Sequence, residues 1–251
     1  MQTIVFKTQQ LLRSAQHPLR NYIKVLQKDS LSDNVKKSEY AVRGKIPMRG
    51  EEIQTELNNG VGNYPFTATT SLNIGNPQAV GQGHLSFNRE VLACLIHPML
   101  LKTDAITKDG KNRALLYKSK LDTPMGAYTS NSKGYAYARE KIAEFIKKRD
   151  NVPHCDPKDI YITNGAGEGV KLVFSMLIRG KNDGIMIPIP QYPLYSALIT
   201  LNGGTQISYF LDEQQNWALD TNDVKKKIAD SKKAGIDIRC VVIINPGNPT
   251  G

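Results

Sequence analysis

The chain of 251 residues is 40% hydrophobic, 22% charged and 7% aromatic, which is typical of one or two globular domains. This composition excludes a disordered, collagen-like or low-complexity chain. The three cysteines are far apart and form no CxxC pair, which disfavours a disulfide scaffold and a structural zinc site. No apolar run reaches the ~20 residues that span a bilayer.

The formal net charge of +10 is concentrated in part at the N-terminus, where residues 1–28 contain five bases and no acidic residue. The other bases are dispersed over runs such as 147–149 and 225–227, without interleaved aromatics or a helix-turn-helix, RRM or finger motif. This pattern argues against a nucleic-acid-binding protein. An acid-free basic segment is typical of a transit peptide or of a short basic helix before the folded domain. We therefore expect a cytoplasmic or mitochondrial protein.

The first half of the chain predicts few regular elements. Residues 30–75 mix glycine, proline and polar residues, with a helix predicted over 50–57. Apolar residues at helical spacing predict a second helix over 88–101, and Pro98 is expected to disturb its end.

Residues 102–134 are predicted as a loop, with 108–111 (Lys-Asp-Gly-Lys) as a turn. The segment 132–149 predicts an amphipathic helix. The apolar side chains that this helix is expected to bury are Ile142, Phe145 and Ile146.

From residue 159 onward, short apolar runs alternate with helical patterns. The predicted strands are 160–163, 184–189, 205–211 and 239–244, the last of them apolar on both faces. The predicted helices between them are 170–178, 192–201 and 220–234, with Asp220 or Asn222 as the N-cap of the third. Such alternation predicts an α/β fold with a mixed, mostly parallel sheet that is covered on both faces.

The chain stops at Gly251, seven residues after the strand that is expected to end at Ile244. No crossover helix follows that strand, and a doubly wound domain ending there would leave apolar sheet uncovered. We therefore expect these residues to be the front part of a longer chain.

Three stretches of unusual composition follow predicted strands, at the sheet edge where open α/β folds bind ligands. In the first, 163–169, small residues would let helix N-terminal amides approach a phosphate. This stretch is no P-loop, because no Lys-Ser/Thr pair follows, and it departs from GxGxxG, because the third glycine comes one residue early, at Gly169. Tight packing between strand and helix remains an equal explanation for its glycines.

The second stretch, 188–195, contains three prolines that would present Tyr192 at the strand end, where its ring could stack on a planar group or pack over the sheet edge. The third stretch, 245–251, contains two Asn-Pro steps that would hold an amide side chain over the same edge. A phosphate cradle, a ring and an amide at one edge indicate a phosphorylated planar cofactor.

Residues 245–251 resemble the NPxNPTG motif of the fold-type-I aminotransferases that use pyridoxal 5'-phosphate. Further stretches resemble the alanine aminotransferase branch, in the same order along the chain: 39–44, 73–78, 126–130, 188–197, 209–213 and 217–220. The resemblance runs from about residue 36 to the end. It implies the large domain of that fold, in part, together with part of a smaller α+β domain.

Carried over by position, the resemblance implies that Ala166 and Gly167 donate backbone N–H groups to the cofactor phosphate. It implies that Tyr192 stacks on the pyridine ring and that Asn248 donates to the phenolic oxygen. The family usually has a hydroxyl residue in the phosphate loop, and the matching position here is Gly167. Gly167 would therefore offer the phosphate a backbone N–H but no hydroxyl hydrogen bond.

The resemblance also implies that Gly75 meets the substrate carboxylate, in a loop where a side chain would obstruct. Tyr128 would reach the phosphate of the neighbouring subunit, which implies a homodimer with shared active sites. The partners implied are an amino acid and a 2-oxo acid; no metal, nucleic acid or membrane is expected.

In this family the lysine that forms the Schiff base, the acidic partner of the pyridine nitrogen and the substrate arginines all lie beyond the NPxNPTG motif. No lysine here stands in a matching context, so no catalytic residue is assigned within 251 residues. We expect a whole protein that transfers the amino group of L-alanine to 2-oxoglutarate by a ping-pong mechanism, and no turnover by these residues alone.

The resemblance and the shift in composition predict an extension over 1–30, an arm with part of the small domain over 31–125, and the first part of the large domain over 126–251. Three alternatives remain. These are a naturally truncated, non-catalytic binding protein, an aminotransferase of another specificity, and a dinucleotide-binding domain. The last of these predicts an acidic residue at the end of the strand 184–189, where the sequence has Ile-Pro-Ile-Pro instead.

Overall fold

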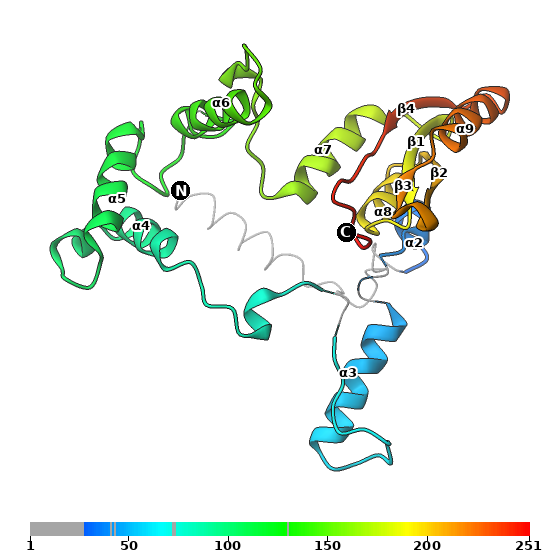
Figure 1. The fold of residues 1–251 in the computed structure, drawn as a ribbon, viewed down its shortest axis with the longest axis horizontal. Helices are drawn as coiled ribbons and strands as arrows, with labels where there is room; N and C mark the ends of the chain where they lie inside the picture. The colour runs from blue at the N-terminus through cyan, green and yellow to red at the C-terminus, as the bar shows by residue number, and fades with distance from the viewer. Residues whose placement is uncertain (1–27, 41, 43, 72–73, 130) are drawn as a thin grey trace, which may run out of the picture. The chain divides into compact units, whose positions relative to one another are not determined.

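The computed structural model describes residues 28–251 except 41, 43, 72, 73 and 130. The N-terminal segment on which the compartment prediction rests therefore lies almost wholly outside the described residues. The chain divides into two compact units, whose helices and strands are labelled in Figure 1. Of the described residues, the sheet unit contains 28–39 and 177–251, and the helical unit contains those between 40 and 176. We describe each by itself.

The sheet unit contains a four-stranded sheet in the order β3-β2-β1-β4. Its strands are β1 (Asp183–Ile189), β2 (Thr205–Asp212), β3 (Ala218–Leu219) and β4 (Asp237–Val241). β1 pairs in parallel with both β2 and β4, and β3 adds an antiparallel edge to β2. The predicted α/β class with a mixed, mostly parallel sheet is confirmed.

β1 is the central strand and is buried on both faces, with residues 185–187 at an exposed fraction of 0%. The backbone hydrogen bonds between β1 and β4 explain why this strand tolerates Pro188. Val242 donates its N–H to the carbonyl oxygen of Met186 at 2.8 Å, so Met186, and Pro188 two residues later, turn their backbone groups toward β4. The β4 ladder ends at Val241, and the missing N–H of Pro188 therefore removes no sheet hydrogen bond.

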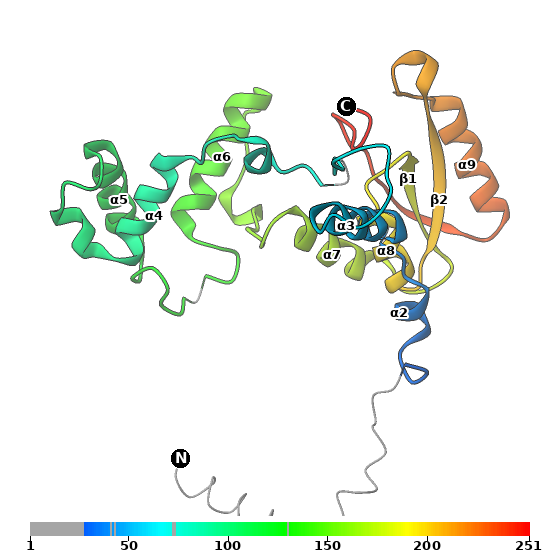
Figure 2. The ribbon, with the colours of Figure 1, turned by 90° about the horizontal axis from the view of Figure 1, so that it is seen from below.

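The helices α8 (Leu194–Leu201) and α9 (Thr221–Lys233) connect the strands and lie on either side of the β1–β2 pair (Figure 2). This placement follows from right-handed crossovers that run in opposite directions across the sheet, from β1 to β2 through α8 and from the β2–β3 side back to β4 through α9. The carboxylate of Asp220 accepts a hydrogen bond from the N–H of Asn222 at 2.8 Å, which confirms Asp220 as the cap of α9. The short helix α2 (Asp33–Lys37) packs on α8.

The fourth strand differs from its prediction. β4 ends at Val241, and exposed residues alternate along it with half-buried ones. Val241 and Ile243 are 40% and 70% exposed. The predicted bounds 239–244 are therefore wrong, whereas the exposure of these apolar side chains agrees with the expectation that apolar sheet is left uncovered at this strand.

The helical unit consists of helices joined by irregular segments. Its elements are α3 (Lys45–Asn58), η3 (Pro77–Val80), α4 (Ser86–Ile96), η4 (Pro98–Lys102), α5 (Lys108–Lys120), α6 (Ala136–Asp150), η5 (Pro157–Asp159) and α7 (Ala166–Leu177), whose last residue begins the other unit. Pro98 ends α4 and opens η4, as expected from its missing N–H. The core between α4 and α5 contains Val91, Cys94 and Ala114.

The helix α5 occupies part of the segment that the sequence predicts as a loop, so that prediction is wrong. Thr107 caps the helix, because its hydroxyl oxygen accepts the N–H of Gly110 at 3.2 Å. The carboxylate of Glu90, from α4, accepts the N–H of Thr107 at 3.2 Å and also its hydroxyl. This tertiary anchor offsets the ~1 kcal/mol that a glycine costs inside a helix.

The structure also corrects the predicted buried face of α6 and the strand predicted over 160–163. Helix α6 confirms the predicted helix, but it buries Ala143; of the three side chains expected to be buried, Ile146 is half-buried, Phe145 is 60% exposed and Ile142 is 37% exposed. Residues 160–163 are extended but belong to no strand; Ile162 donates its N–H to the carbonyl oxygen of Lys133 at 2.9 Å. A strand needs a neighbour, and this run pairs with no strand in the part of the chain that the structure describes.

Candidate cofactor-binding site

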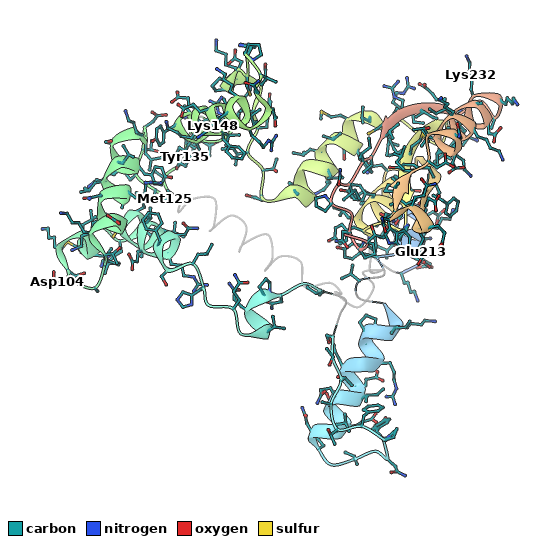
Figure 3. All side chains as sticks on the ribbon, viewed as in Figure 1. Asp104, Met125, Tyr135, Lys148, Glu213 and Lys232 are labelled. Carbon is teal, nitrogen blue, oxygen red and sulfur yellow. The ribbon has the colours of Figure 1, made fainter. Side chains whose placement is uncertain are left out.

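In the sheet unit, the carboxyl ends of β1, β2 and β4 lie at one edge, because these strands are parallel. Tyr192 follows β1 by three residues and is half-buried, and Asn248 follows β4 in a turn with its side chain exposed. Glu213, which begins the short helix η6 (Glu213–Gln215), follows β2 at the same edge (Figure 3). The structure thus brings Tyr192 and Asn248 to one edge.

Tyr192 lies in a loop that is held by its neighbours. The side-chain amide of Gln191 donates to the hydroxyl of Ser196 at 3.1 Å, and that hydroxyl donates to the carbonyl oxygen of Pro193 at 3.1 Å. These bonds join both ends of the loop to the first turn of α8. The carbonyl oxygen of the Gln191 side chain is buried and has no hydrogen-bond partner among the described residues. The loop therefore retains a buried acceptor beside Tyr192.

Tyr209 holds the segment that leads to Asn248. Its side chain is 1% exposed, and its hydroxyl donates to the carbonyl oxygen of Val242 at 2.6 Å. Burial raises the pKa of this phenol. The sequence pattern by itself indicates no role for Tyr209, although the alternation of β2 places it on one face with Ile207 and Leu211. The phenol anchors the start of the segment 242–251.

In the helical unit, Ala166 and Gly167 form the first turn of α7. Gly165 precedes them with a φ of +83°, a conformation that favours glycine, and Gly169 makes the first helical bond, to the carbonyl oxygen of Gly165 at 3.4 Å. The amides of the first turn have no acceptor within the helix, and the helix dipole adds positive potential there. Glu168 in this turn lies 3.6 Å from Lys171, which offsets its charge.

Two other predicted site residues lie in loops of the helical unit. Tyr128 is 97% exposed and directly follows a turn in which Ala127 donates its N–H to the carbonyl oxygen of Pro124. Gly75 is exposed, and a Cβ atom built on it meets no heavy atom within 4 Å. Within the described residues, no steric contact requires glycine at position 75. Its role toward a substrate carboxylate stays a prediction.

The structure therefore places four of the predicted cofactor-binding residues in two separate groups. Ala166 and Gly167 share one helix turn, Tyr192 and Asn248 share one sheet edge, and the two groups belong to different units. Amide donors, an aromatic ring and an amide side chain fit the chemistry of a ring that bears a phosphate. The buried, unpartnered acceptor of Gln191 at the sheet edge is consistent with a ligand or further protein groups at that edge.

Other kinds of site receive no support from the described part of the chain. No group of three or more His, Cys, Asp or Glu side chains is placed there to hold a metal ion. Within the same residues, every helix is too short or too polar to cross a bilayer.

A sequence profile for aminotransferase class I and II matches residues 102–251. Glutamate–glyoxylate aminotransferase 1 of Arabidopsis thaliana is 44% identical over 233 residues, which are 91% of this chain and 46% of that protein. Alanine aminotransferase 2 of Panicum miliaceum is 44% identical over 228 residues, which are 89% of this chain and 47% of that protein.

The fold is similar to that of a solved aminotransferase from Escherichia coli. The two superpose with a TM-score of 0.61 at 26% identity, over 87% of this chain and 43% of that one. The chain thus spans about half the length of the curated relatives it matches.

Proposed function

Because this chain belongs to the class I and II aminotransferases, we propose that it forms the cofactor-facing part of an enzyme that moves the amino group of L-alanine to 2-oxoglutarate. The products would be pyruvate and L-glutamate. The observation that carries this proposal is the 44% identity, over nine-tenths of the chain, to relatives named for alanine and for glutamate–glyoxylate transamination.

We propose that the chain binds pyridoxal 5'-phosphate with the residues at the start of α7 and at the edge of the sheet. The cofactor, when bound, supplies an electron sink for negative charge at the α-carbon of the amino acid. The amides of Ala166 and Gly167 would hold its phosphate with the help of the helix dipole. The ring of Tyr192 would fix the plane of the pyridine ring, and the amide of Asn248 would donate to the phenolic oxygen.

The remaining predicted residues have roles in substrate binding and assembly. Gly75 would lie against the substrate carboxylate. Tyr128, which is almost fully exposed in its own unit, would reach the phosphate held by a second subunit of a homodimer. Gly167 offers a backbone donor but no hydroxyl, so the phosphate would depend more on main-chain amides here than on side chains.

A second substrate pair is favoured by a specific observation. The glutamate–glyoxylate and alanine relatives are equally similar to this chain, at 44% identity. The resemblance of 73–78 and 188–197 to the alanine branch leads us to rank alanine first. A non-catalytic binding protein is the remaining alternative, and it predicts cofactor or partner binding without amino-group transfer.

We also propose the organisation that the sequence predicts for the whole protein. It comprises an extension over 1–30, an arm with part of the small domain over 31–125, and the start of the large domain over 126–251. The cytosol and the mitochondrion are the proposed compartments, on the basic composition of residues 1–28 alone.

The cofactor proposal is tested with pyridoxine 5'-phosphate, which has the ring and phosphate but no aldehyde to react with surface lysines. We expect the 251-residue chain to bind it more tightly than pyridoxine in calorimetry. Ala166→Pro removes one phosphate-facing N–H at the first helical position, where proline is tolerated, and should weaken binding about tenfold. Tyr192→Leu should weaken it roughly three- to tenfold.

The matched controls are Ala136→Pro, at the first residue of α6, and Tyr195→Leu, in α8, and both should bind as the parent chain does. Equal affinity for the phosphorylated and unphosphorylated ligands would contradict the phosphate cradle. Alanine-dependent formation of pyruvate by protein purified from its source would support the proposed activity. Glyoxylate-dependent consumption of glutamate, with no formation of pyruvate from alanine, would favour glutamate and glyoxylate as the substrates. We expect the 251 residues alone to catalyse neither reaction.

A further inference from the structure

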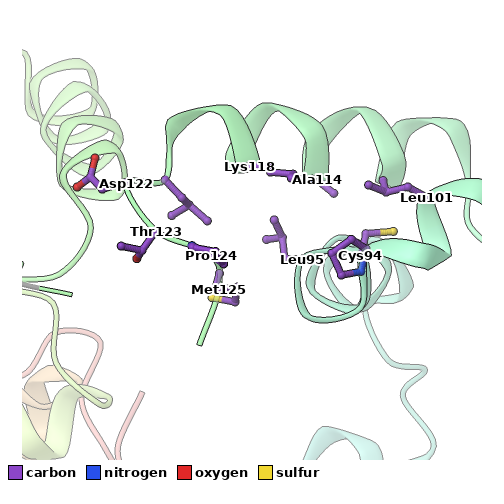
Figure 4. A pocket seen from close by; sticks show the side chains of 11 residues that line it. Cys94, Leu95, Leu101, Ala114, Lys118, Asp122, Thr123, Pro124 and Met125 are labelled. Atoms are coloured by element: carbon purple, nitrogen blue, oxygen red, sulfur yellow. The ribbon is translucent and has the colours of Figure 1, made fainter. Parts of the chain in front are cut away.

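The helical unit contains a cavity of about 230 Å³ between α4, η4, α5 and the segment 121–125 (Figure 4). Its walls are mainly apolar, with Cys94 among them, and Lys118 and Asp122 add one charge of each sign. Such walls favour no particular ligand charge, and they include none of the residues proposed for the cofactor. In the sheet unit, by contrast, the buried phenol of Tyr209 is bonded to the segment that leads to the proposed site.

Tyr209 connects two strands that are not neighbours in the sheet. It lies on β2 opposite Pro188 of β1, and β1 separates β2 from β4. Its side chain is buried and extends across β1, so that the hydroxyl donates to the carbonyl oxygen of Val242 at 2.6 Å. A single side chain thus joins β2 to the continuation of β4.

This bond stands where Pro188 can form no main-chain bond. Val242 extends the parallel ladder by donating its N–H to the carbonyl oxygen of Met186 at 2.8 Å. In a parallel ladder, the carbonyl of such a residue accepts from the residue two positions further along the neighbouring strand, which is residue 188 here. Proline has no N–H with which to extend the ladder, and the hydroxyl of Tyr209 satisfies the carbonyl instead.

Beyond Val242, the segment 243–251 is held only weakly by the sheet. Among the described residues, this segment forms no hydrogen bond to a strand, and Ile243 is 70% exposed. The backbone bond that it does form is internal, from the N–H of Gly251 to the carbonyl oxygen of Gly247 at 2.8 Å. The course of the segment is therefore set where it leaves the sheet, at Val242.

The segment also lacks close packing on the side that faces the turn between β2 and β3. A cavity of about 260 Å³ lies there, and it is lined by Trp217 of that turn and by Ile243, Asn245 and Thr250 of the segment. This space leaves the segment room to shift. A fixed point at its start therefore decides where Asn248 lies.

We propose, on the basis of the proposed function, that Tyr209 is a positioning residue of the cofactor site. Its hydroxyl fixes the carbonyl of Val242, gives the segment 243–251 one course away from the sheet, and so sets the position from which Asn248 donates to the phenolic oxygen of the cofactor. Tyr209 itself is buried and acts only through this segment. Loss of the hydroxyl should therefore weaken cofactor binding through Asn248 alone.

The test measures binding to the 251-residue chain by calorimetry, with pyridoxine 5'-phosphate and its 3-deoxy analogue, which lacks the phenolic oxygen. Tyr209→Phe keeps the ring and removes the hydroxyl. It should weaken pyridoxine 5'-phosphate about fivefold and the 3-deoxy analogue by less than about twofold. The double variant with Asn248→Ala should bind no more weakly than Asn248→Ala alone, because both changes remove the same contact.

Pro188→Ala supplies a main-chain donor in place of the phenol. In the Tyr209→Phe chain it introduces an N–H that faces the carbonyl of Val242, and it should recover most of the lost affinity. A loss of ring packing would not be recovered in this way. Tyr117→Phe is the matched control, because it removes a hydroxyl from α5 in the other unit and should bind as the parent chain does.

Hydrogen exchange provides a readout that needs no ligand. The N–H of Val242, which is bonded to Met186, should exchange about fivefold faster in Tyr209→Phe, and Pro188→Ala should slow it again. The amides of residues 185–187 in β1 should not change. If Tyr209→Phe alone fails to fold, the double variant with Pro188→Ala retains a donor to Val242 and should still fold and bind.

The outcomes separate this role from the proposed function. If the parent chain does not bind pyridoxine 5'-phosphate, the cofactor site is wrong and the role of Tyr209 in it is wrong as well. If the parent chain binds and Tyr209→Phe binds equally well, or loses the same factor for both ligands, only the positioning role is wrong. A loss confined to the ligand with the phenolic oxygen, and recovered by Pro188→Ala, would support it.

Discussion

The sheet unit and the helical unit bury their apolar side chains in different ways. In the sheet unit, residues 185–187 of β1 are completely buried between the neighbouring strands β2 and β4 and beneath the helices that connect the strands. In the helical unit, the core of Val91, Cys94 and Ala114 joins two helices that follow one another, while Ile46 and Val80 are 87% and 86% exposed. The comparison shows that the central strand concentrates the hydrophobic stabilisation, whereas the helices depend more on caps and local contacts.

Ile187→Ala should have the largest effect on stability. The side chain is 0% exposed, and its truncation in a packed core costs about 2–5 kcal/mol in the free energy of unfolding. Urea denaturation followed by the fluorescence of Trp217 measures this, since the only tryptophan of the chain lies in the sheet unit. Ile46→Ala is the matched control and should change the free energy by less than about 0.5 kcal/mol. Similar losses for both variants would break the comparison.

Asp183→Asn tests the polar anchor at the start of β1. The Asp183 carboxylate accepts hydrogen bonds from the backbone N–H, Nε and Nη2 of Arg179 at 2.7, 3.0 and 2.6 Å. The Arg179 guanidinium and backbone N–H hold the pKa of Asp183 well below its usual range. Because this pKa is lower in the folded chain, the ion pair stabilises the fold above the unfolded pKa of ~3.9 and its contribution is lost as the pH falls below that value.

The parent chain should therefore lose stability between about pH 5 and pH 2, and Asp183→Asn should flatten that loss and lower the Tm at pH 7 by roughly 5 °C. Thermal melts at several pH values measure both effects. Asp237→Asn is the control, because the Asp237 side chain is 57% exposed and accepts single bonds from Arg179 and Arg239 at 3.2 Å each. If both variants have the same pH profile as the parent chain, the burial of Asp183 has no energetic role.

Thr107→Ala should have the smallest effect and should be confined to the helical unit. It removes the side-chain cap of α5 and the hydroxyl bond to Glu90, while the backbone N–H of residue 107 still donates to Glu90, at a cost of about 1 kcal/mol. Hydrogen exchange of the α5 amides measures this loss, and the amides of β1 should remain unchanged. Ser119→Ala, near the other end of α5, is the control. Faster exchange throughout β1 would show that the two units unfold together.

Local patterns in the sequence predict the sheet well and the helices less well. The run 184–189 predicts β1 within one residue at its start, because a strand buried on both faces is apolar throughout. Helix α9 and its cap Asp220 follow from periodicity and a local side-chain bond. In contrast, α5 depends on Glu90 from another helix, and the buried face of α6 at Ala143 does not follow the largest apolar side chains.

The same distinction applies to the candidate site. The glycines at 165 and 167, the ring of Tyr192 and the amide of Asn248 are recognisable from composition and motif, because chemistry at a strand end needs particular residue types. Gln191 and Tyr209 became visible only through their hydrogen bonds to Ser196 and Val242.

By itself, the sequence determined the α/β class, the central strand, the strand-end loops and the aminotransferase family. The tertiary structure alone decided that α5 is a helix, that residues 160–163 form no strand, that β4 is an exposed edge and that a cavity lies beside Cys94. The physical reason is that hydrophobic period and turn chemistry are properties of neighbouring residues. Pairing, burial and cavities depend on which distant residues meet.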